Sequence, residues 1–300
     1  MSETRRGIGL GALAYVLWGG FPLYFPLLRP ASPLEVLAHR VVWSLLVMAI
    51  LVQLTRRWTS VVAVLADPAR LRRLAAAALF LAVNWGVYIY GVTSGRVVET
   101  SLGYFINPLV TVLMGVVVLH EELRRVQWAA LGVAGLAVVV LSVQNGHPPW
   151  LALILAGSFG SYGLLKKTAD VGAIEGLAVE TAVLAPVALG YLVWGGLRGD
   201  STFASHGVGH ASLLISTGIV TAFPLLCFGA AAALIPLTTL GVLQYLAPTL
   251  QFVIGVLVLG EELGLVKLLG FCLVWIALAA FTVDLVANAR RTGVRVAEPV

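Results

Sequence analysis

The chain has 300 residues, of which 60% are hydrophobic and only 11% are charged, and its net charge is +5. A soluble globular domain is about 45–50% apolar and about 25% charged. This composition therefore excludes a soluble enzyme, a secreted disulfide scaffold and a nucleic-acid-binding module. The two cysteines lie in separate apolar runs and have no metal-ligand or disulfide spacing.

Apolar stretches follow one another along the whole chain. A helix that crosses a bilayer needs about 20 mostly apolar residues. The connections between the stretches are short, and the longest are 55–72 and 197–210. We therefore predict an all-α polytopic membrane protein of ten transmembrane helices at 8–28, 34–54, 73–93, 100–119, 126–143, 150–165, 174–196, 211–232, 238–259 and 266–286.

Basic residues orient these predicted spans, because Lys and Arg concentrate in cytoplasmic connections. With the N-terminus inside, the inner segments hold fourteen Lys and Arg residues and the outer segments hold four, while Arg40 lies within a span. Both termini, including a tail at 287–300, are therefore expected in the cytoplasm. The range 8–28 is too long for the apolar core of a signal peptide and contains Pro22 and Pro26.

The sequence repeats itself at an offset of 140 residues. Residues 108–123 align with 248–263 without a gap, and 8 of these 16 positions are identical. Each copy contains five predicted spans, an odd number, so the second copy must enter the membrane from the opposite side. Such inverted repeats occur in many secondary transporters. We predict two inverted five-helix repeats at 8–143 and 150–286, with Glu121 inside and Glu261 outside.

In both repeats, one helical face carries polar residues, a proline and a glycine. In the fourth predicted span its residues recur at i, i+4, i+7 and i+11, and the ninth span repeats the pattern. Polar groups in hydrocarbon are costly and usually face a cavity or a partner. We expect these faces to form two walls of a central pathway; helix packing with satisfied polar groups is the alternative. They comprise Tyr104, Pro108, Thr111, Gly115, Gln244, Pro248, Gln251 and Gly255.

Other polar and aromatic residues fall near the middle of predicted spans. Those that could contact a substrate in the same pathway are Asn84, Trp85, Tyr88, Asn107 and Tyr245. Prolines in a helix remove a backbone donor and can break or bend it. The expected helix breaks are Pro108, Pro248 and Pro224, the last of which matches Asn84 in the second repeat.

Ionisable residues mark a candidate coupling or gating site. Glu35 and His39 are four residues apart in the second span, and Arg40 is adjacent. His and a partly buried Glu can titrate near neutral pH, which makes protons candidate partners. A purely structural cluster is the alternative. Glu180 matches Arg40 in the second repeat, so the two could meet, although they start from opposite membrane faces.

The sequence contains few of the motifs that are typical of enzymes. It contains no HExxH or GxSxG motif and no glycine-rich phosphate loop with a lysine. We therefore expect no catalytic residues, no cofactor and no bound metal, and a transporter driven by a gradient of substrate or ion. A membrane-embedded lipid-modifying enzyme and a passive channel are the alternatives.

Five segments resemble a known family. EVLAHRVVWS (35–44), NWGVYIYGV (84–92), ETSLGYFINPLVTVLMG (99–115), GIVTAFPLLCFGAAA (218–232) and TLGVLQYLAPTL (239–250) are similar to the RarD group of EamA-type transporters, in the drug/metabolite transporter superfamily. The resemblance extends from about residue 7 to residue 290, and departs at His120, where the second half has Gly260.

This resemblance implies a bacterial inner-membrane permease of two EamA repeats that exports a drug or metabolite. Together with the inverted repeat, it predicts alternating access around a cavity at the membrane midplane. The expected partners are the lipid bilayer and a small-molecule substrate, with no nucleic acid. The fifth and tenth spans carry few polar groups and are candidates for a homodimer contact.

Overall fold

The computed structural model describes residues 3–119, 123–235 and 243–291. Regular structure in these residues is helical, as the sequence predicted, and they contain no β-strand. The elements are α1 (Glu3–Gly19), α2 (Phe21–Tyr24), the 3-10 turn η1 (Phe25–Leu28), α3 (Pro33–Leu54), α4 (Trp58–Ala66), α5 (Pro68–Thr93), α6 (Val97–Leu119), α7 (Arg125–Asn145), α8 (Trp150–Ala169), α9 (Ala173–Arg198), α10 (Gly207–Leu234), α12 (Leu246–Val253), the π-helical turn η2 (Ile254–Val258) and α13 (Leu265–Arg291).

Local sequence signals set several helix ends. Ser32 caps α3, and its hydroxyl accepts a hydrogen bond from the Glu35 backbone N–H (3.2 Å). Asp67 caps α5 in the same way by accepting from two backbone N–H groups. At the C-terminal ends of α7 and α9, glycines with φ of 69° and 75° adopt the left-handed conformation that stops a helix.

The structure corrects three details of the predicted spans. The first span is broken after Gly19, because Pro22 and Pro26 each begin a new short helical segment, α2 and η1. The connection predicted at 55–72 contains α4. Within the described residues, the ninth span consists of α12 and η2 rather than one uninterrupted α-helix.

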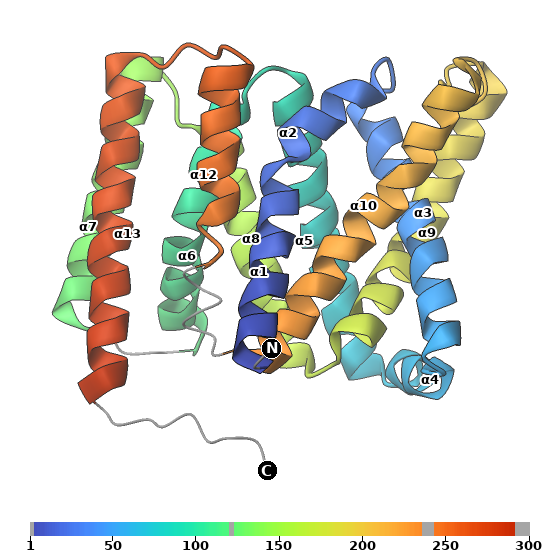
Figure 1. Ribbon diagram of the computed structural model, residues 1–300, viewed down its shortest axis with the longest axis horizontal. Helices are drawn as coiled ribbons and strands as arrows, with labels where there is room; N and C mark the ends of the chain where they lie inside the picture. Colours follow the sequence, from blue (N-terminus) through green and yellow to red (C-terminus); the bar gives the residue numbers. More distant parts are fainter. Residues whose placement is uncertain (1–2, 120–122, 236–242, 292–300) are drawn as a thin grey trace.

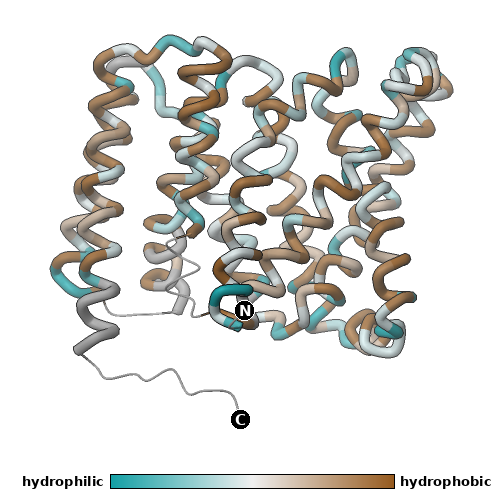
Figure 2. The backbone as a smooth tube through the Cα atoms, in the orientation of Figure 1, coloured by the Kyte–Doolittle hydropathy of each residue, from teal (hydrophilic) through white to brown (hydrophobic). Residues whose placement is uncertain are grey.

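Consecutive long helices run in alternating directions, and α1 begins at the same end of the molecule at which α13 ends (Figure 1). The helix α4 also lies at this end. Among the residues that the structure describes, seven helices are long and apolar enough to cross a membrane. Hydrophobic residues extend along the helices, while hydrophilic residues gather near their ends (Figure 2).

Large apolar side chains cover much of the outer surface. Leu197 and Val208 are each 83% exposed, and Val187 and Leu257 are each 77% exposed. Soluble proteins rarely expose contiguous apolar patches of this kind, whereas a helix surface in lipid is apolar. The arrangement is that of a multi-pass membrane protein.

Helices from the two halves of the chain pack against each other. The helix α1 packs on α10 and α12, and α8 packs on α5 and α6. The helix α3 contacts α9 and α10, α9 also contacts α5, and α6 contacts α12. The pair α7 and α13 lies at one side of the bundle (Figure 1). The centre of the molecule is therefore an interface between residues before and after the chain midpoint.

Candidate functional site

A buried arginine occupies this central interface. Arg40, on α3, is 3% exposed, and its Nε–H donates a hydrogen bond to Thr221 Oγ1 on α10 (2.7 Å). Its guanidinium carbon lies 4.1 Å from the centre of the Trp85 ring, 5.4 Å from that of Phe21 and 5.7 Å from that of Phe25. These distances allow cation–π attraction. We refer to Phe21, Phe25 and Trp85 as the aromatic cage.

The broken first span supplies two walls of this cage. Phe21 begins α2 and Phe25 begins η1, so the two proline-started segments place both rings in the interior. Their rings are in edge contact, with centroids 5.3 Å apart. Tyr24, between them, is anchored to α10, because its hydroxyl donates to the Leu213 carbonyl (3.0 Å) and hydrogen-bonds to the Ser216 hydroxyl (2.8 Å).

A hydrogen-bonded network lies beside the cage and joins the two halves. The Asn84 amide, on α5, donates to the Leu155 carbonyl (3.0 Å) and to Ser158 Oγ (3.1 Å), both on α8. Asn84 Oδ1 accepts from the Tyr104 hydroxyl on α6 (3.0 Å). Asn84 is 1% exposed, so these bonds satisfy a polar group that would otherwise be costly in the interior.

Tyr88 links this network to the cage. Its ring contacts Tyr104 edge-on, with centroids 5.5 Å apart, and also contacts Phe21 and Phe25. The Tyr88 hydroxyl is buried and has no hydrogen-bond partner in the described part of the chain. The structure therefore brings Asn84, Trp85, Tyr88 and Tyr104 together, as expected of pathway residues, and adds Arg40 to them.

Glu35 and His39 face a different region from Arg40. Glu35 Oε1 accepts hydrogen bonds from the Thr202 backbone N–H (2.7 Å) and the Ser201 hydroxyl (3.2 Å). These partners lie in the α9–α10 connection, so the predicted cluster of Glu35, His39 and Arg40 is divided. Residues 39 and 40 are neighbours in the helix and project in directions about 100° apart.

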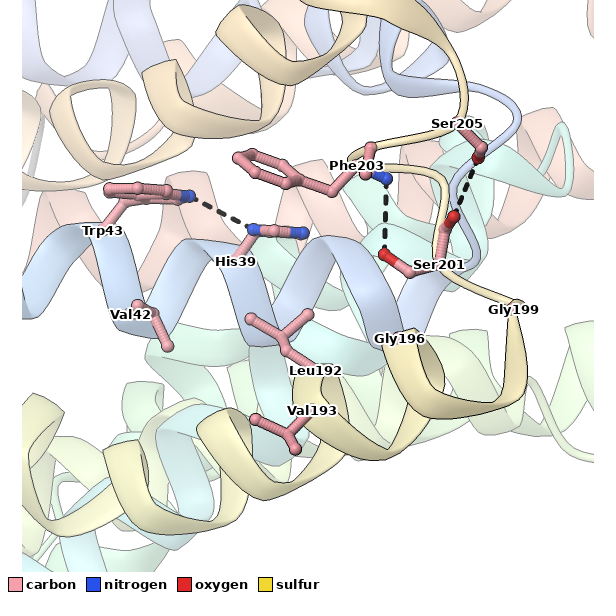
Figure 3. A pocket seen from close by; sticks show the side chains of 11 residues that line it. His39, Val42, Trp43, Leu192, Val193, Gly196, Gly199, Ser201, Phe203 and Ser205 are labelled. Carbon is pink, nitrogen blue, oxygen red and sulfur yellow. Dashed lines mark hydrogen bonds between the residues drawn. The ribbon is translucent and has the colours of Figure 1, made fainter.

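His39 borders a cavity of about 570 Å³ between α3, α9 and the α9–α10 connection. Its ring stacks on Phe203 with centroids 4.9 Å apart, and its Nδ1 accepts from Trp43 Nε1 (3.1 Å). Figure 3 shows both aromatic residues beside His39, with Leu192 and Val193 on the facing helix. Because Val193 is 60% exposed, this cavity lies towards the outer surface of the bundle, not at its centre.

Glu180 does not contact Arg40. It is fully buried on α9, and Oε1 accepts from Lys166 Nζ (2.5 Å) while Oε2 accepts from the Tyr162 hydroxyl (3.4 Å). Both partners lie on α8. The suggested Arg40–Glu180 pair is therefore replaced by separate interactions, since each residue finds its nearest partners at its own depth.

The ninth-span residues of the expected pathway separate. Gln251 is 2% exposed, and its amide donates to the Trp18 carbonyl on α1 (3.2 Å). Tyr245 instead packs against the apolar cluster formed mainly by α6, α7 and α13. Gln244 is partly exposed. Asn107, on α6, is buried, with Oδ1 unpartnered among the described residues. The Thr111 side chain and Glu121 lie outside the described residues.

The predicted helix breaks have mixed outcomes. Pro108 and Pro224 lie within α6 and α10, which both continue through them. Pro248 lies in the first turn of α12, where a missing N–H leaves no intrahelical bond unmade. The actual interruption of the ninth span is the π-helical turn η2, which follows Gln251 by three residues.

Sequence reasoning missed several residues of the site. Thr221, Ser158, Phe21 and Phe25 contact the predicted residues directly. Small hydroxyls in a spanning helix are weak signals, because each can bond to a carbonyl of its own helix. Paired prolines in the first span were the available signal for the two phenylalanines.

Sequence comparisons find relatives over nearly the whole chain. The sequence profile of the EamA-like transporter family matches residues 5–143. "Protein RarD" of Streptomyces exfoliatus is 51% identical over 294 residues, which cover 98% of this chain and 93% of that protein. A Vibrio cholerae protein described as an uncharacterized transporter is 43% identical, with 94% of this chain and 93% of the relative covered.

A solved crystal structure shares the fold. It superposes with a TM-score of 0.60 at 19% sequence identity, and the match covers 96% of this chain and 98% of the solved chain.

Proposed function

Because the chain belongs to the EamA-like transporter family, within its RarD group, we propose that this membrane transporter is a secondary transporter. It carries a small drug or metabolite by alternating access between two inverted five-helix repeats. The pathway passes the cluster of Arg40, Asn84, Trp85, Tyr88 and Tyr104 at the interface between the repeats.

The pairing of helices supports the inverted repeat. In the proposed arrangement α1, α3, α5, α6 and α7 correspond to α8, α9, α10, α12 and α13. Exchanging the two sets converts the α1–α10 contact into α8–α5 and the α1–α12 contact into α8–α6, and both pairs pack. The same exchange leaves the α3–α9, α6–α12 and α7–α13 pairs unchanged. A two-fold relation between two halves of opposite direction produces such a pattern.

The orientation follows from charge. The end of the molecule where α1 begins and α13 ends also holds α4 and the start of α5, around which Arg56, Arg57, Arg70, Arg72 and Arg73 lie. Basic residues favour the cytoplasmic side. We therefore place this end, with both termini, in the cytoplasm of the bacterial inner membrane, and ten helices across the bilayer.

The single observation that carries the proposal is the network around Asn84. Its amide and carbonyl groups join α5 and α6 to α8 through three hydrogen bonds at a buried position. Secondary transporters of inverted repeats place their substrate sites at the interface between the repeats, and polar groups within spans mark such sites. A rocking motion of one repeat against the other would rearrange this network, and a substrate can offer replacement partners.

The test is a flux assay in proteoliposomes, with a substrate selected by comparing the metabolites of cells that lack or overproduce the protein. A carrier saturates, and unlabelled substrate inside the vesicles accelerates uptake of labelled substrate; a channel does neither. Tyr104→Ala should abolish uptake, whereas Tyr90→Ala, at a position 48% exposed on α5, should retain it. Unsaturable flux without acceleration would refute the proposal.

The pair α7 and α13 is the proposed contact for a homodimer. It lies at one side of the bundle, and Val143 and Val283, on its surface, are 78% and 68% exposed. Cross-linking of cysteines at these two positions in membranes would test the contact; no cross-linked dimer would contradict it.

A further inference from the structure

Arg40 is a buried cation that forms no ion pair with the residues that the structure describes. The guanidinium carries five N–H donors. Thr221 accepts the hydrogen bond of Nε–H, while Nη1 is buried and has no partner in the residues that the structure describes. The ion pairs found in these residues do not include Arg40.

The surroundings of Arg40 offset only part of the cost of burying its charge. A charged side chain within a membrane span is expensive and normally faces a partner or a water-filled cavity. The cage rings supply cation–π attraction, and Thr221 supplies one neutral acceptor. The one acid that the repeat relates to Arg40 is Glu180, which Lys166 already neutralises.

We propose that Arg40 binds the carboxylate of a monoanionic substrate, whose flat apolar body lies against the surrounding aromatic rings. This inference rests on the proposed transport function and deepens it by naming the substrate class. The carboxylate accepts hydrogen bonds from Arg40 Nη1 and from the Tyr88 hydroxyl, two buried donors that lack partners in the described residues.

The charge of the site favours a monoanion over a phosphate dianion. Within the described residues, Arg40 is the cation found over the cage rings, and Tyr88 contacts two of those rings, Phe21 and Phe25. A dianion would bring a second charge into the interior without a second cation to offset it. A flat aromatic body suits a site walled by aromatic side chains, because rings pair by stacking or edge contacts. Tyr88 and Tyr104 already pair edge-on there, and Trp85 lies beneath the Arg40 guanidinium.

The test uses the full-length protein purified in detergent, with benzoate as the probe. Benzyl alcohol, benzylamine and phenyl phosphate are the neutral, cationic and dianionic comparators. At about ten times its Kd, benzoate should raise the Tm of the wild type by about 4 °C, because ligand binding to the folded state stabilises it. The comparators should give smaller shifts. An equal shift with benzyl alcohol or benzylamine would overturn the proposal.

Variants locate the binding to Arg40. Arg40→Met should weaken benzoate binding about tenfold or more, because a charge-assisted hydrogen bond is lost. Arg198→Met is the matched control: Arg198 also lies over an aromatic ring, 4.7 Å from the centre of Trp194, but is exposed. Full benzoate binding by a folded Arg40→Met protein would overturn the proposal.

Two further variants keep the test informative if Arg40→Met does not fold. Arg40→Lys retains the charge and should bind benzoate with reduced affinity, and Tyr88→Phe removes one proposed donor and should weaken binding severalfold. Unchanged affinity in both would overturn the proposal. Flux assays separate the two hypotheses: saturable transport of cations only refutes the carboxylate site, whereas carboxylate binding at Arg40 without counterflow refutes alternating access.

Discussion

Arg40 and Glu180 occupy equivalent places in the two halves of the chain and have opposite environments. Each is the eighth residue of its helix, α3 or α9, and the two helices pack against each other. At 1.5 Å per residue, each lies roughly 10 Å from its helix start. Glu180 has a cation and a tyrosine hydroxyl as partners, whereas Arg40 has one threonine hydroxyl and three aromatic rings.

This difference gives the two residues different roles: Glu180 is a paired charge that stabilises the fold, and Arg40 is an unpaired charge that can bind a ligand. A buried ion pair with satisfied hydrogen bonds holds two helices in place, and removing one partner leaves an uncompensated charge. A buried cation without an ion-pair partner carries a desolvation cost that a bound anion would offset. In the proposed transporter, equivalent positions of the two halves would thus have different roles: Glu180 would stabilise the fold and Arg40 would bind the ligand.

The largest expected effect comes from breaking the Glu180 pair. Lys166→Met should destabilise the protein by about 3 kcal/mol, because it leaves the buried carboxylate unpaired. Arg40→Met should change stability by no more than about 1 kcal/mol, because losing the hydrogen bond to Thr221 is offset by removing a buried charge that has no ion pair among the described residues. Denaturant unfolding of the purified proteins measures both. If Arg40→Met lowered the free energy of unfolding more than Lys166→Met, Arg40 and not Glu180 would be the charge that stabilises the fold.

A glycine on α10 sets the distance between Arg40 and Thr221. A Cβ atom at Gly218 would lie 2.5 Å from the backbone carbonyl carbon of Trp43 on α3, so α10 must move away from α3. Gly218→Ala should cost about 2 kcal/mol, as expected of overpacking, and should weaken benzoate binding.

The matched control is Gly209→Ala on the same helix, where a Cβ atom meets nothing within 4 Å. It should leave thermal stability unchanged or slightly raised. Equal Tm values for the two variants would show that the close approach of α3 and α10 does not limit stability.

The two tyrosines near Arg40 distinguish a satisfied hydroxyl from an unsatisfied one. Tyr104→Phe removes the donor to Asn84 Oδ1 and should cost about 1 kcal/mol, because a buried acceptor loses its partner. Tyr88→Phe removes a hydroxyl that has no partner in the described residues and should leave stability nearly unchanged. Thermal unfolding of both variants without ligand tests this, and a larger loss in Tyr88→Phe would contradict it.

The sequence predicted which residues of the buried cluster matter, but not which way the side chains of α3 point. Hydropathy and residue type identified Asn84, Trp85, Tyr88 and Tyr104 because polar and aromatic groups in an apolar span need partners. Adjacency in sequence grouped Arg40 with His39, although neighbouring helix residues point about 100° apart. Which of them faces the interior depends on how α3 is rotated against α9 and α10, and such packing is a tertiary property.

The sequence repeat also suggested a contact between Arg40 and Glu180 that the structure does not contain. An offset of 140 residues aligns Arg40 with Glu180, each the eighth residue of its helix, but it does not tell whether the aligned residues touch. Lys166 could not be recognised as the partner of Glu180, because the connection between α8 and α9 had to be placed first. The paired prolines that break the first span have Tyr162 and Lys166 at the matching positions of the second half, so the two halves surround their charges with different groups.

Glu261 is a half-buried acid, and its environment predicts a pH dependence that extends the comparison with Glu180. In the connection between η2 and α13, its carboxylate accepts hydrogen bonds from the backbone N–H groups of Val97 and Val98, the first residues of α6. A helix N-terminus thus takes the place that Lys166 has at Glu180. Burial raises the pKa of the Glu261 carboxyl above its ordinary value, although these hydrogen bonds and Lys267 lower it.

The sign of the effect follows from this raised pKa. At pH values between the pKa of Glu261 in the unfolded chain and its raised pKa in the folded protein, the folded protein binds more protons than the unfolded chain. Stability therefore falls as the pH rises through this range. Relative to Glu261→Gln, the wild type should therefore lose stability as the pH increases through the raised pKa and stay level above it. Tm values of both proteins from pH 4 to pH 8 measure this difference, which solvent screening keeps small. A wild type that gained stability with rising pH would mean that the hydrogen bonds from the α6 N-terminus outweigh the burial of the Glu261 carboxylate.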